Sequence, residues 1–309
     1  MIFCCGESLI DMIPAADASG ASCFSPLPGG AIFNTAVALG RLGTSVAMVS
    51  GVSTDLFGQQ LVASLSASQV NQDYLIRSSK PTTLAFVQLN GGQASYTFYD
   101  ENSAGRSFLT DDLPALPEQA SCLYFGGISL ISEPAANSYL ALAKQHAGQR
   151  VIVLDPNIRP SFIVDEARYR SRLDDFFALA DIIKVSDEDL AWLVPTTESE
   201  LAQVQGLNAK AGSLIIVTHG AEGATAYRQG HEIAQAASKK VEVVDTVGAG
   251  DTFNAGVLAS LAAQGCLQKA SLANISSEQI QTALAKGAKV AAVTVSRSGA
   301  NPPWADELV

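Results

Sequence analysis

The sequence predicts an α/β fold, in which a mostly parallel sheet has helices on both faces, giving three layers, and a small antiparallel sheet forms a lid. Two observations carry this prediction. Short apolar runs rich in β-branched residues alternate along the chain with longer segments of helical periodicity. Two strand-like stretches, residues 81–89 and 94–99, break this alternation, and Asn90-Gly91-Gly92 between them is typical of a hairpin turn.

Glycine and proline mark the boundaries of the expected elements. Gly40 and Gly43 close a helix that begins near Gly30, and Pro134 opens another helix. Further helices are expected between the strands of the main sheet. Those strands span residues 1–6, 45–50, 121–126, 151–154, 182–185, 213–218 and 241–244.

The hairpin at residues 81–99 is expected to join strands at 8–14 and 22–27, so that the lid occupies about 8–28 and 81–106. Ligands of open α/β sheets bind in the crevice at the carboxyl ends of the parallel strands, and a lid over this crevice could close on them. The alternative is a β-flap with no part in binding.

The composition excludes several classes of protein. With 48% hydrophobic and 16% charged residues the chain is expected to be globular. A net charge of −11, with no cluster of basic residues, argues against binding to nucleic acid or to an anionic membrane surface. No apolar run approaches the ~20 residues of a membrane span, and the first residues, MIFCCGESLIDMIP, lack the basic start typical of a signal peptide. The five cysteines form no C-x-x-C motif. We therefore expect a cytoplasmic protein with reduced cysteines.

The segment DTVGAGDTFNAG, residues 245–256, predicts a strand, a tight loop and the start of a helix. The first N–H groups of a helix lack backbone partners and attract anions, and Gly248, Ala249 and Gly250 would let a phosphate approach them closely. Asp251 would repel a passively bound phosphate, but it fits a general base that takes the proton of an attacking hydroxyl. A helix-capping aspartate is the alternative. A dinucleotide fingerprint would need glycine where Phe253 stands.

DTVGAGDTFNAGVL resembles the C-terminal signature of the ribokinase-like (PfkB) carbohydrate kinase family. PGGAIFNTAVALGRLG (28–43) and SGVSTDLFG (50–58) are similar to two N-terminal motifs of this family, with Ser53 in place of a glycine. GESLIDMIP, LDPNIRPSF and KVSDEDLAWL look most like the fructokinases within it. The resemblance implies one ribokinase-like domain over residues 1–309 that transfers phosphate from ATP to a sugar hydroxyl, D-fructose first. Ribose, a nucleoside or 2-keto-3-deoxygluconate are alternative acceptors, and a non-catalytic sugar or nucleotide sensor is an alternative of another class.

The resemblance also implies roles for single residues. Asp251 is the general base, and Gly248, Ala249 and Gly250 form the anion hole for the transferring phosphoryl group. The residues implied to bind the sugar are Asp11, Gly29, Gly30, Asn34, Phe98, Asn157 and Arg159. Three alternatives stay open: a solubilising charge at a strand end for Asp11, plain core packing for Phe98, and an ion pair with Asp155 or Asp165 for Arg159.

ATP and cations are assigned by the same resemblance. The residues implied to bind ATP are Lys184, Ser186, Thr218, Gly220, Gly223 and Gly287. Mg²⁺ is expected near Glu188 and Asp189, with the choice between these carboxylates open and an acidic helix start as the alternative. A monovalent cation such as K⁺ is expected at Asp245, Val247, Thr294, Arg297 and Gly299. Two chains are expected to pair through the lid as a homodimer.

Overall fold

The computed structural model describes residues 1–90, 93–196, 199–211 and 213–308. Its main element is a sheet whose strands run in the order β14-β13-β12-β11-β10-β9-β1-β4. These strands are β1 (Ile2–Cys5), β4 (Val46–Val49), β9 (Cys122–Gly126), β10 (Val151–Asp155), β11 (Ile182–Ser186), β12 (Leu214–Thr218), β13 (Ala224–Arg228) and β14 (His231–Ala236). All pairings from β12 to β4 are parallel, whereas β13 and β14 form an antiparallel edge. The mostly parallel sheet is confirmed.

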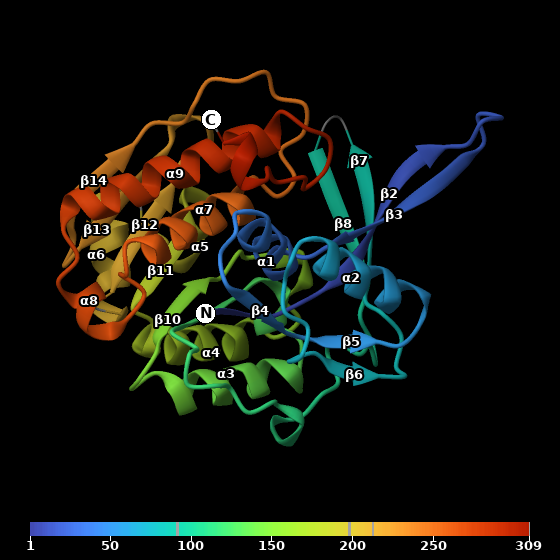
Figure 1. Cartoon of the computed structure of the whole chain (residues 1–309), viewed down its shortest axis with the longest axis horizontal. Helices are drawn as coiled ribbons and strands as arrows, with labels where there is room; N and C mark the ends of the chain where they lie inside the picture. The colour runs from blue at the N-terminus through green and yellow to red at the C-terminus, as the bar shows by residue number, and fades with distance from the viewer. Residues whose placement is uncertain (91–92, 197–198, 212, 309) are drawn as a thin grey trace.

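Helices cover both faces of this sheet (Figure 1). One face carries α1 (Ala31–Arg41), α2 (Leu56–Ala67), α7 (Ala249–Ala263), α8 (Lys269–Ala273) and α9 (Ser277–Val295). The other face carries α3 (Ala135–His146), α4 (Glu166–Leu179), α5 (Asp187–Leu193) and α6 (Glu200–Ala211). Because strand side chains alternate between faces, Cys4 packs into the first core and Cys5 into the second. Both thiols are free and buried, as expected.

The lid is a separate sheet in the order β3-β2-β7-β8. Its strands are β2 (Leu9–Ala16), β3 (Ser22–Gly29), β7 (Leu84–Asn90) and β8 (Gln93–Tyr99), and the β2–β3 hairpin reaches away from the main body (Figure 1). The pairs β2–β3 and β7–β8 are antiparallel, while β2 pairs with β7 in parallel. Two glycines of the expected hairpin turn, residues 91–92, lie outside the described residues.

Shorter elements connect these layers. Strands β5 (Gly51–Ser53) and β6 (Ile76–Ser78) form a two-stranded parallel sheet beside α2. Single turns of 3₁₀ helix are η1 (Thr110–Asp112), η2 (Gly127–Leu130), η3 (Pro160–Phe162), η4 (Gly220–Glu222) and η5 (Ala305–Glu307). No helix in the described ranges is long and apolar enough to cross a membrane.

The expected strand at residues 241–244 is wrong. This segment runs over the surface, with Val241, Val243 and Val244 exposed by 41%, 59% and 61%. The Val244 N–H donates to the carbonyl of Val295 at the end of α9, 2.8 Å away, instead of joining a ladder. The edge of the sheet near β12 is taken by the β13–β14 hairpin, which the strand prediction missed. The segment therefore lies outside the sheet despite its alternating pattern.

Candidate active site

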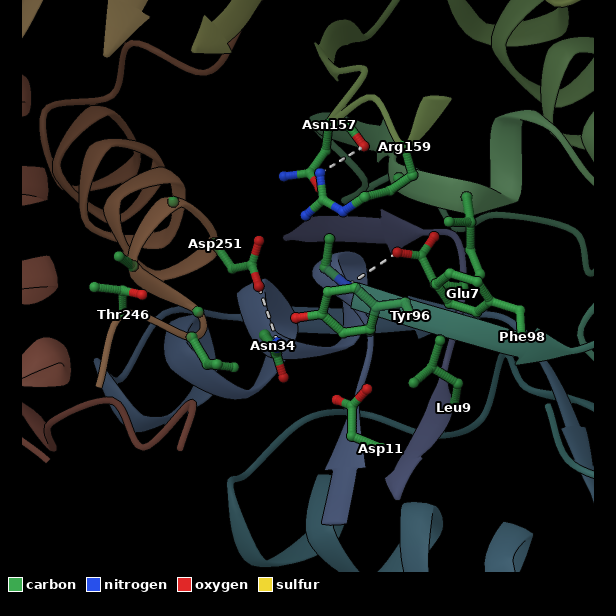
Figure 2. A pocket seen from close by; sticks show the side chains of 18 residues that line it. Glu7, Leu9, Asp11, Asn34, Tyr96, Phe98, Asn157, Arg159, Thr246 and Asp251 are labelled. Carbon is green, nitrogen blue, oxygen red and sulfur yellow. Dashed lines mark hydrogen bonds between the residues drawn. The ribbon is translucent and has the colours of Figure 1, made fainter. Parts of the chain in front are cut away.

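A cavity of about 280 Å³ lies between the lid and the carboxyl ends of the parallel strands (Figure 2). The lid contributes Leu9, Asp11, Tyr96 and Phe98 to its lining. The rest of the lining is formed by Glu7, Gly30, Ala31, Asn34, Gly127, Ile128, Asn157, Arg159 and residues 246–251. The lid is therefore a wall of the cavity rather than a decorative flap, and the crevice lies where the fold class predicts it.

The N-termini of two helices face this cavity. The N-caps are Gly30 in α1, with φ 106°, and Gly248 in α7, with φ 76°, and neither residue carries a capping side chain. The start of α1 is occupied by the carboxylate of Glu7, which accepts the Ala31 N–H at 2.9 Å. At the start of α7, Gly248, Ala249 and Gly250 border the cavity, and the Ala249 N–H donates to the carbonyl of Thr246 at 3.2 Å. An external anion can therefore use the dipole and N–H groups of α7.

Gly248 has a second reason to be glycine. A Cβ at this position would lie 2.6 Å from the Cβ of Ala300, closer than two carbons can approach. The absence of a side chain at Gly248 therefore permits both the left-handed backbone and the close contact with the loop after α9.

Asp251 stands in the first turn of α7 and is buried. Its Oδ2 accepts a hydrogen bond from Nδ2 of Asn34 at 2.9 Å. Burial raises the pKa of Asp251 to about 6, although the Asn34 hydrogen bond opposes the shift. The carboxylate is therefore mostly ionised at neutral pH and basic enough to accept a proton. This bond also supplies the partner that the Asn34 amide needs on a buried helix face.

Asp11 reaches the cavity from β2, across from Asp251 (Figure 2). Burial, and next the charge of Asp251, raises the pKa of Asp11 to about 7. A Cβ at Gly29 would lie 2.0 Å from Oδ2 of Asp11, so the glycine leaves the space that the carboxylate occupies. Asp11 is a wall of the cavity and not a solubilising charge at a strand end.

Arg159 and Asn157 follow β10 and face the cavity. Nη1 of Arg159 donates to the carbonyls of Asn157 at 3.3 Å and Ile158 at 3.1 Å. Within the described residues no carboxylate lies within 4.0 Å of this guanidinium, so the alternative of an ion pair with Asp155 or Asp165 is not found. Its remaining donors are available to a ligand.

Phe98 serves two purposes. It lines the cavity, and its ring packs edge-on against Phe162 with the centroids 4.7 Å apart. Phe98 is thus both part of the cavity wall and a packing residue, and its contact with a sugar stays a prediction. Tyr96 lies two residues earlier on the same face of β8 and enters the cavity beside it (Figure 2). Tyr96 was missed, although its spacing from Phe98 was a usable signal.

Glu7 also lines the cavity, although the sequence analysis did not name it as a site residue. Its buried carboxylate accepts N–H groups from Ala31 at 2.9 Å, Ile32 at 3.4 Å and Ser129 at 3.2 Å, joining α1 to η2. Burial raises the pKa of Glu7 to about 7. A Cβ at Gly127, where φ is 65°, would lie 2.2 Å from Oε1 of Glu7. An acidic residue directly after the apolar run of β1 was the signal that could have revealed it.

A second, mostly apolar cavity of about 630 Å³ meets the first one at Thr246, Ala249 and Gly250, which line both. Its lining brings together Thr218, Gly220, Gly223, Ala221, Ser238, Lys239, Lys240, Val241, Val243, Phe253, Ala288, Ala291, Ala292 and Val295. Three residues assigned to the nucleotide, at positions 218, 220 and 223, are thus gathered at one end of it. The open start of α7 lies at the junction of the two cavities.

A model of the pfkB family carbohydrate kinases matches residues 1–307 of the chain. The chain belongs to this family. It is 46% identical over 281 residues to a fructokinase of Rhizobium leguminosarum bv. trifolii, covering 91% of this chain and 86% of that one. A solved structure of a fructokinase of Xylella fastidiosa with bound ATP is similar, with a TM-score of 0.88 and 30% identity, covering 99% of this chain and 97% of that one. A fructokinase of Vibrio cholerae O395 in a form with fructose, ADP and calcium ion bound has a TM-score of 0.83 and 26% identity, covering 97% of this chain and 94% of that one. The expected family is confirmed, and the protein is a carbohydrate kinase.

Gly287 lies elsewhere than the resemblance to this pfkB family implied. It is buried where α9 packs on α7, and a Cβ there would lie 2.8 Å from Cγ2 of Val257 and 2.9 Å from the carbonyl of Phe253. The lining of the second cavity includes its neighbour Ala288. The glycine therefore permits close contact between the two helices.

Two carboxylates at the start of α5, those of Glu188 and Asp189, differ in exposure. Glu188 is exposed, whereas Asp189 is buried and accepts the Ile158 N–H at 3.1 Å. Burial, and next the charge of Asp155, raises the pKa of Asp189 to about 6. Ser186 caps the helix by accepting the Asp189 N–H at 3.0 Å. Among the described residues, no group of three His, Cys, Asp or Glu side chains could hold a metal by itself.

Asp245 connects the two loops that were assigned to a monovalent cation in this pfkB family member. Its carboxylate accepts the N–H of Val247 at 3.0 Å and of Gly299 at 2.9 Å. The carbonyl of Thr294 accepts the Arg297 N–H at 3.0 Å, and that of Gly299 accepts the Asn301 N–H at 2.8 Å. The five assigned residues are therefore neighbours. The Thr294 carbonyl also accepts the Ser296 N–H, whereas the Gly299 carbonyl keeps one lone pair within the described residues.

The raised pKa of Asp251 has a consequence for stability. Because the pKa is higher in the folded protein, about 6, than in the unfolded chain, protonation favours folding, and this contribution is lost as the pH rises through 6. Asp251→Asn removes the buried charge and keeps an acceptor for Asn34. We expect the variant to exceed the wild type in free energy of unfolding by roughly 1–3 kcal/mol at pH 8, and by less at pH 5. Urea denaturation at both pH values measures this, and an equal difference at the two would contradict it.

Proposed function

We propose that the protein transfers the γ-phosphate of ATP to the primary hydroxyl of D-fructose. One observation carries this proposal: the buried carboxylate of Asp251 and the open N-terminus of α7 lie side by side where the two cavities meet. A base for a hydroxyl and donors for a phosphoryl group are the two requirements of in-line phosphoryl transfer.

The smaller cavity has the size and polarity for a monosaccharide. Asp11, Asn34 and Arg159 offer an acceptor, an amide and a fork of donors for hydroxyl groups, and Phe98 offers an apolar surface for the ring. The choice of fructose rests on the relatives described above, which are fructokinases, one of them solved with fructose and ADP.

The larger cavity fits the nucleotide. Its apolar lining suits an adenine ring, and the loop at Thr218 to Gly223 would direct the phosphates toward Gly248 to Gly250. In the reaction the sugar oxygen forms a bond to the γ-phosphorus, the bond to the β-phosphate oxygen breaks, and ADP leaves with the electron pair. Asp251 takes the hydroxyl proton, and the N–H groups at the start of α7 stabilise the charge on the phosphoryl oxygens.

Cations complete the proposal. Mg²⁺ would be held mainly by the ATP phosphates, with the inward-facing Asp189 fitting better than the exposed Glu188. The bound ion would neutralise phosphate charge during transfer. K⁺ would be held by the carbonyls near Asp245. The expected pairing of two chains stays a prediction, although Phe24, Phe86 and Tyr99 gather on the lid with ring centroids 5.0 and 5.4 Å apart.

The function is tested by ADP release with ATP and a panel of fructose, ribose, a nucleoside and 2-keto-3-deoxygluconate. We expect kcat/KM to be highest for fructose, and Asp251→Asn to lower kcat by about 10²–10⁴-fold because the general base is lost. A higher kcat/KM for another acceptor than for fructose would contradict the choice of sugar. A fully active Asp251→Asn protein would contradict the role of the base, and a wild type inactive on every acceptor would indicate a sensor.

Gly29→Ala tests the sugar site. Since the new Cβ would displace the Asp11 carboxylate, we expect KM for the sugar to rise about tenfold or more while KM for ATP stays unchanged. Gly148→Ala is the matched control, because a Cβ there meets nothing within 4 Å. Parallel changes in both KM values would mean that Gly29 supports the fold in general and not the sugar pocket.

The proposed cation sites predict that activity falls in two separate experiments, one for each cation. Removing divalent ions with a chelator should abolish ADP release, and Mg²⁺ should restore it. Replacing K⁺ by a bulky organic cation at constant ionic strength should lower kcat, since the loop before α7 would lose a ligand that holds it in place. Full activity in the organic cation would rule out the monovalent site.

A further inference from the structure

A buried ion pair lies behind the start of α7. Lys184 on β11 and Asp155 at the end of β10 are joined by Nζ and Oδ2 at 3.2 Å, with side chains 6% and 1% exposed. Charges are costly to bury, and an ion pair of this kind contributes little net stability compared with two well-packed neutral side chains. Its presence at this place therefore calls for a reason other than stability.

The pair is connected to the helix that carries the proposed base. Oδ2 of Asp155 also accepts a hydrogen bond from Nδ2 of Asn254 at 2.6 Å, and the same amide lies 2.8 Å from the hydroxyl of Tyr124. Asn254 stands on α7, one turn beyond Gly250. Asp155 thus holds both the ammonium group and the helix.

The ammonium group lies directly behind the proposed anion hole. Nζ of Lys184 is 3.4 Å from the point that a Cβ on Gly250 would occupy. An ammonium group has three N–H donors, and Asp155 is the one acceptor that the described part of the chain provides for it. Oδ1 of Asp155 has no partner among the described residues. Two of the three N–H donors of Lys184 are therefore unused within the described residues, and the ammonium group lies against the backbone of Gly250.

Resting on the proposed function, we infer that Lys184, Asp155 and Asn254 are positioning residues that place a positive charge behind the anion hole and strengthen its hold on the transferring phosphoryl group. Lys184 acts through the backbone of Gly250, since it belongs to the described lining of neither cavity. A charge a few ångströms from the reacting group is little screened in a buried site, so it adds to the effect of the helix N–H groups. Asp155 holds the ammonium group in place by accepting its hydrogen bond, and Asn254 fixes the register between the pair and α7.

The test compares Lys184→Met, Asp155→Asn and the double variant. Each single variant leaves one buried group unpaired, so we expect lower stability in urea denaturation. The double variant replaces the pair by neutral groups of similar shape, so its stability should return toward that of the wild type. Its kcat should stay at least about tenfold below the wild type, with KM for the sugar unchanged, because the charge is missing in the transition state.

The pH profile supplies a second readout. The charged groups that act on Asp251 include Lys184, Asp155 and Arg159, with Asp11 and Glu7 across the cavity. The charge of Asp155 raises the pKa of Asp251 and the charge of Lys184 lowers it, so Asp155→Asn should move the acid limb of kcat to lower pH and Lys184→Met should move it to higher pH. A purely structural role would leave this limb in place.

A matched control is the pair Lys144 and Asp175, joined at 2.8 Å on the surface. The double variant Lys144→Met/Asp175→Asn should match the wild type in kcat. If the buried double variant recovered both stability and kcat, the pair would be structural only and the inference wrong. A wild type without sugar-dependent ADP release would instead overturn the proposed function first and this inference with it.

Discussion

The hydrogen bond between Asn34 and Asp251 is the contact on which the site depends. It joins α1 to α7, and a second bond, from the Thr35 hydroxyl to the Asp251 carbonyl at 3.1 Å, lies beside it. These bonds bring the N-termini of both helices to one cavity. Because Glu7 occupies the start of α1, the cavity has a filled end and an open end, and only α7 is left to receive an anion.

The acidic side chains of the cavity are buried, and burial opposes their ionisation. Glu7, Asp11 and Asp251 all have raised pKa values because they are buried, and the charge of Asp251 raises the pKa values of Asp11 and Glu7 further. A cluster of buried acids destabilises the fold at neutral pH, which is a common cost of a functional site. The net charge of −11 gives no long-range attraction for a nucleotide. Local positive potential is available from the helix N-terminus, from Arg159 in the first cavity and from Lys239 and Lys240 in the second.

The agreement between sequence and structure was closest where local chemistry decides the conformation. The glycine-rich loop before α7, the helix from Ala31 to Arg41 and the two hairpins of the lid follow from turn residues and from hydrophobic periodicity. The segment at 241–244 has the same alternating pattern as a strand, yet it is exposed, because β13 and β14 take the places next to β12 and the segment bonds to the end of α9 instead. Gly287 was assigned to the nucleotide, and its surroundings show a helix contact instead.

The sequence by itself determined the fold class, the family and the residues at the start of α7, since backbone preferences and motif spacing act over a few neighbouring positions. Only the tertiary structure decided the partners of the buried charges. Asn34 and Asp251 are 217 positions apart, and Glu7 and Ser129 are 122 apart. Lys184 stands behind Gly250 because β11 and α7 pack there. Such pairings depend on how elements distant in the sequence pack against each other. A buried charge is stable only where this packing places an oppositely charged or hydrogen-bonding partner beside it.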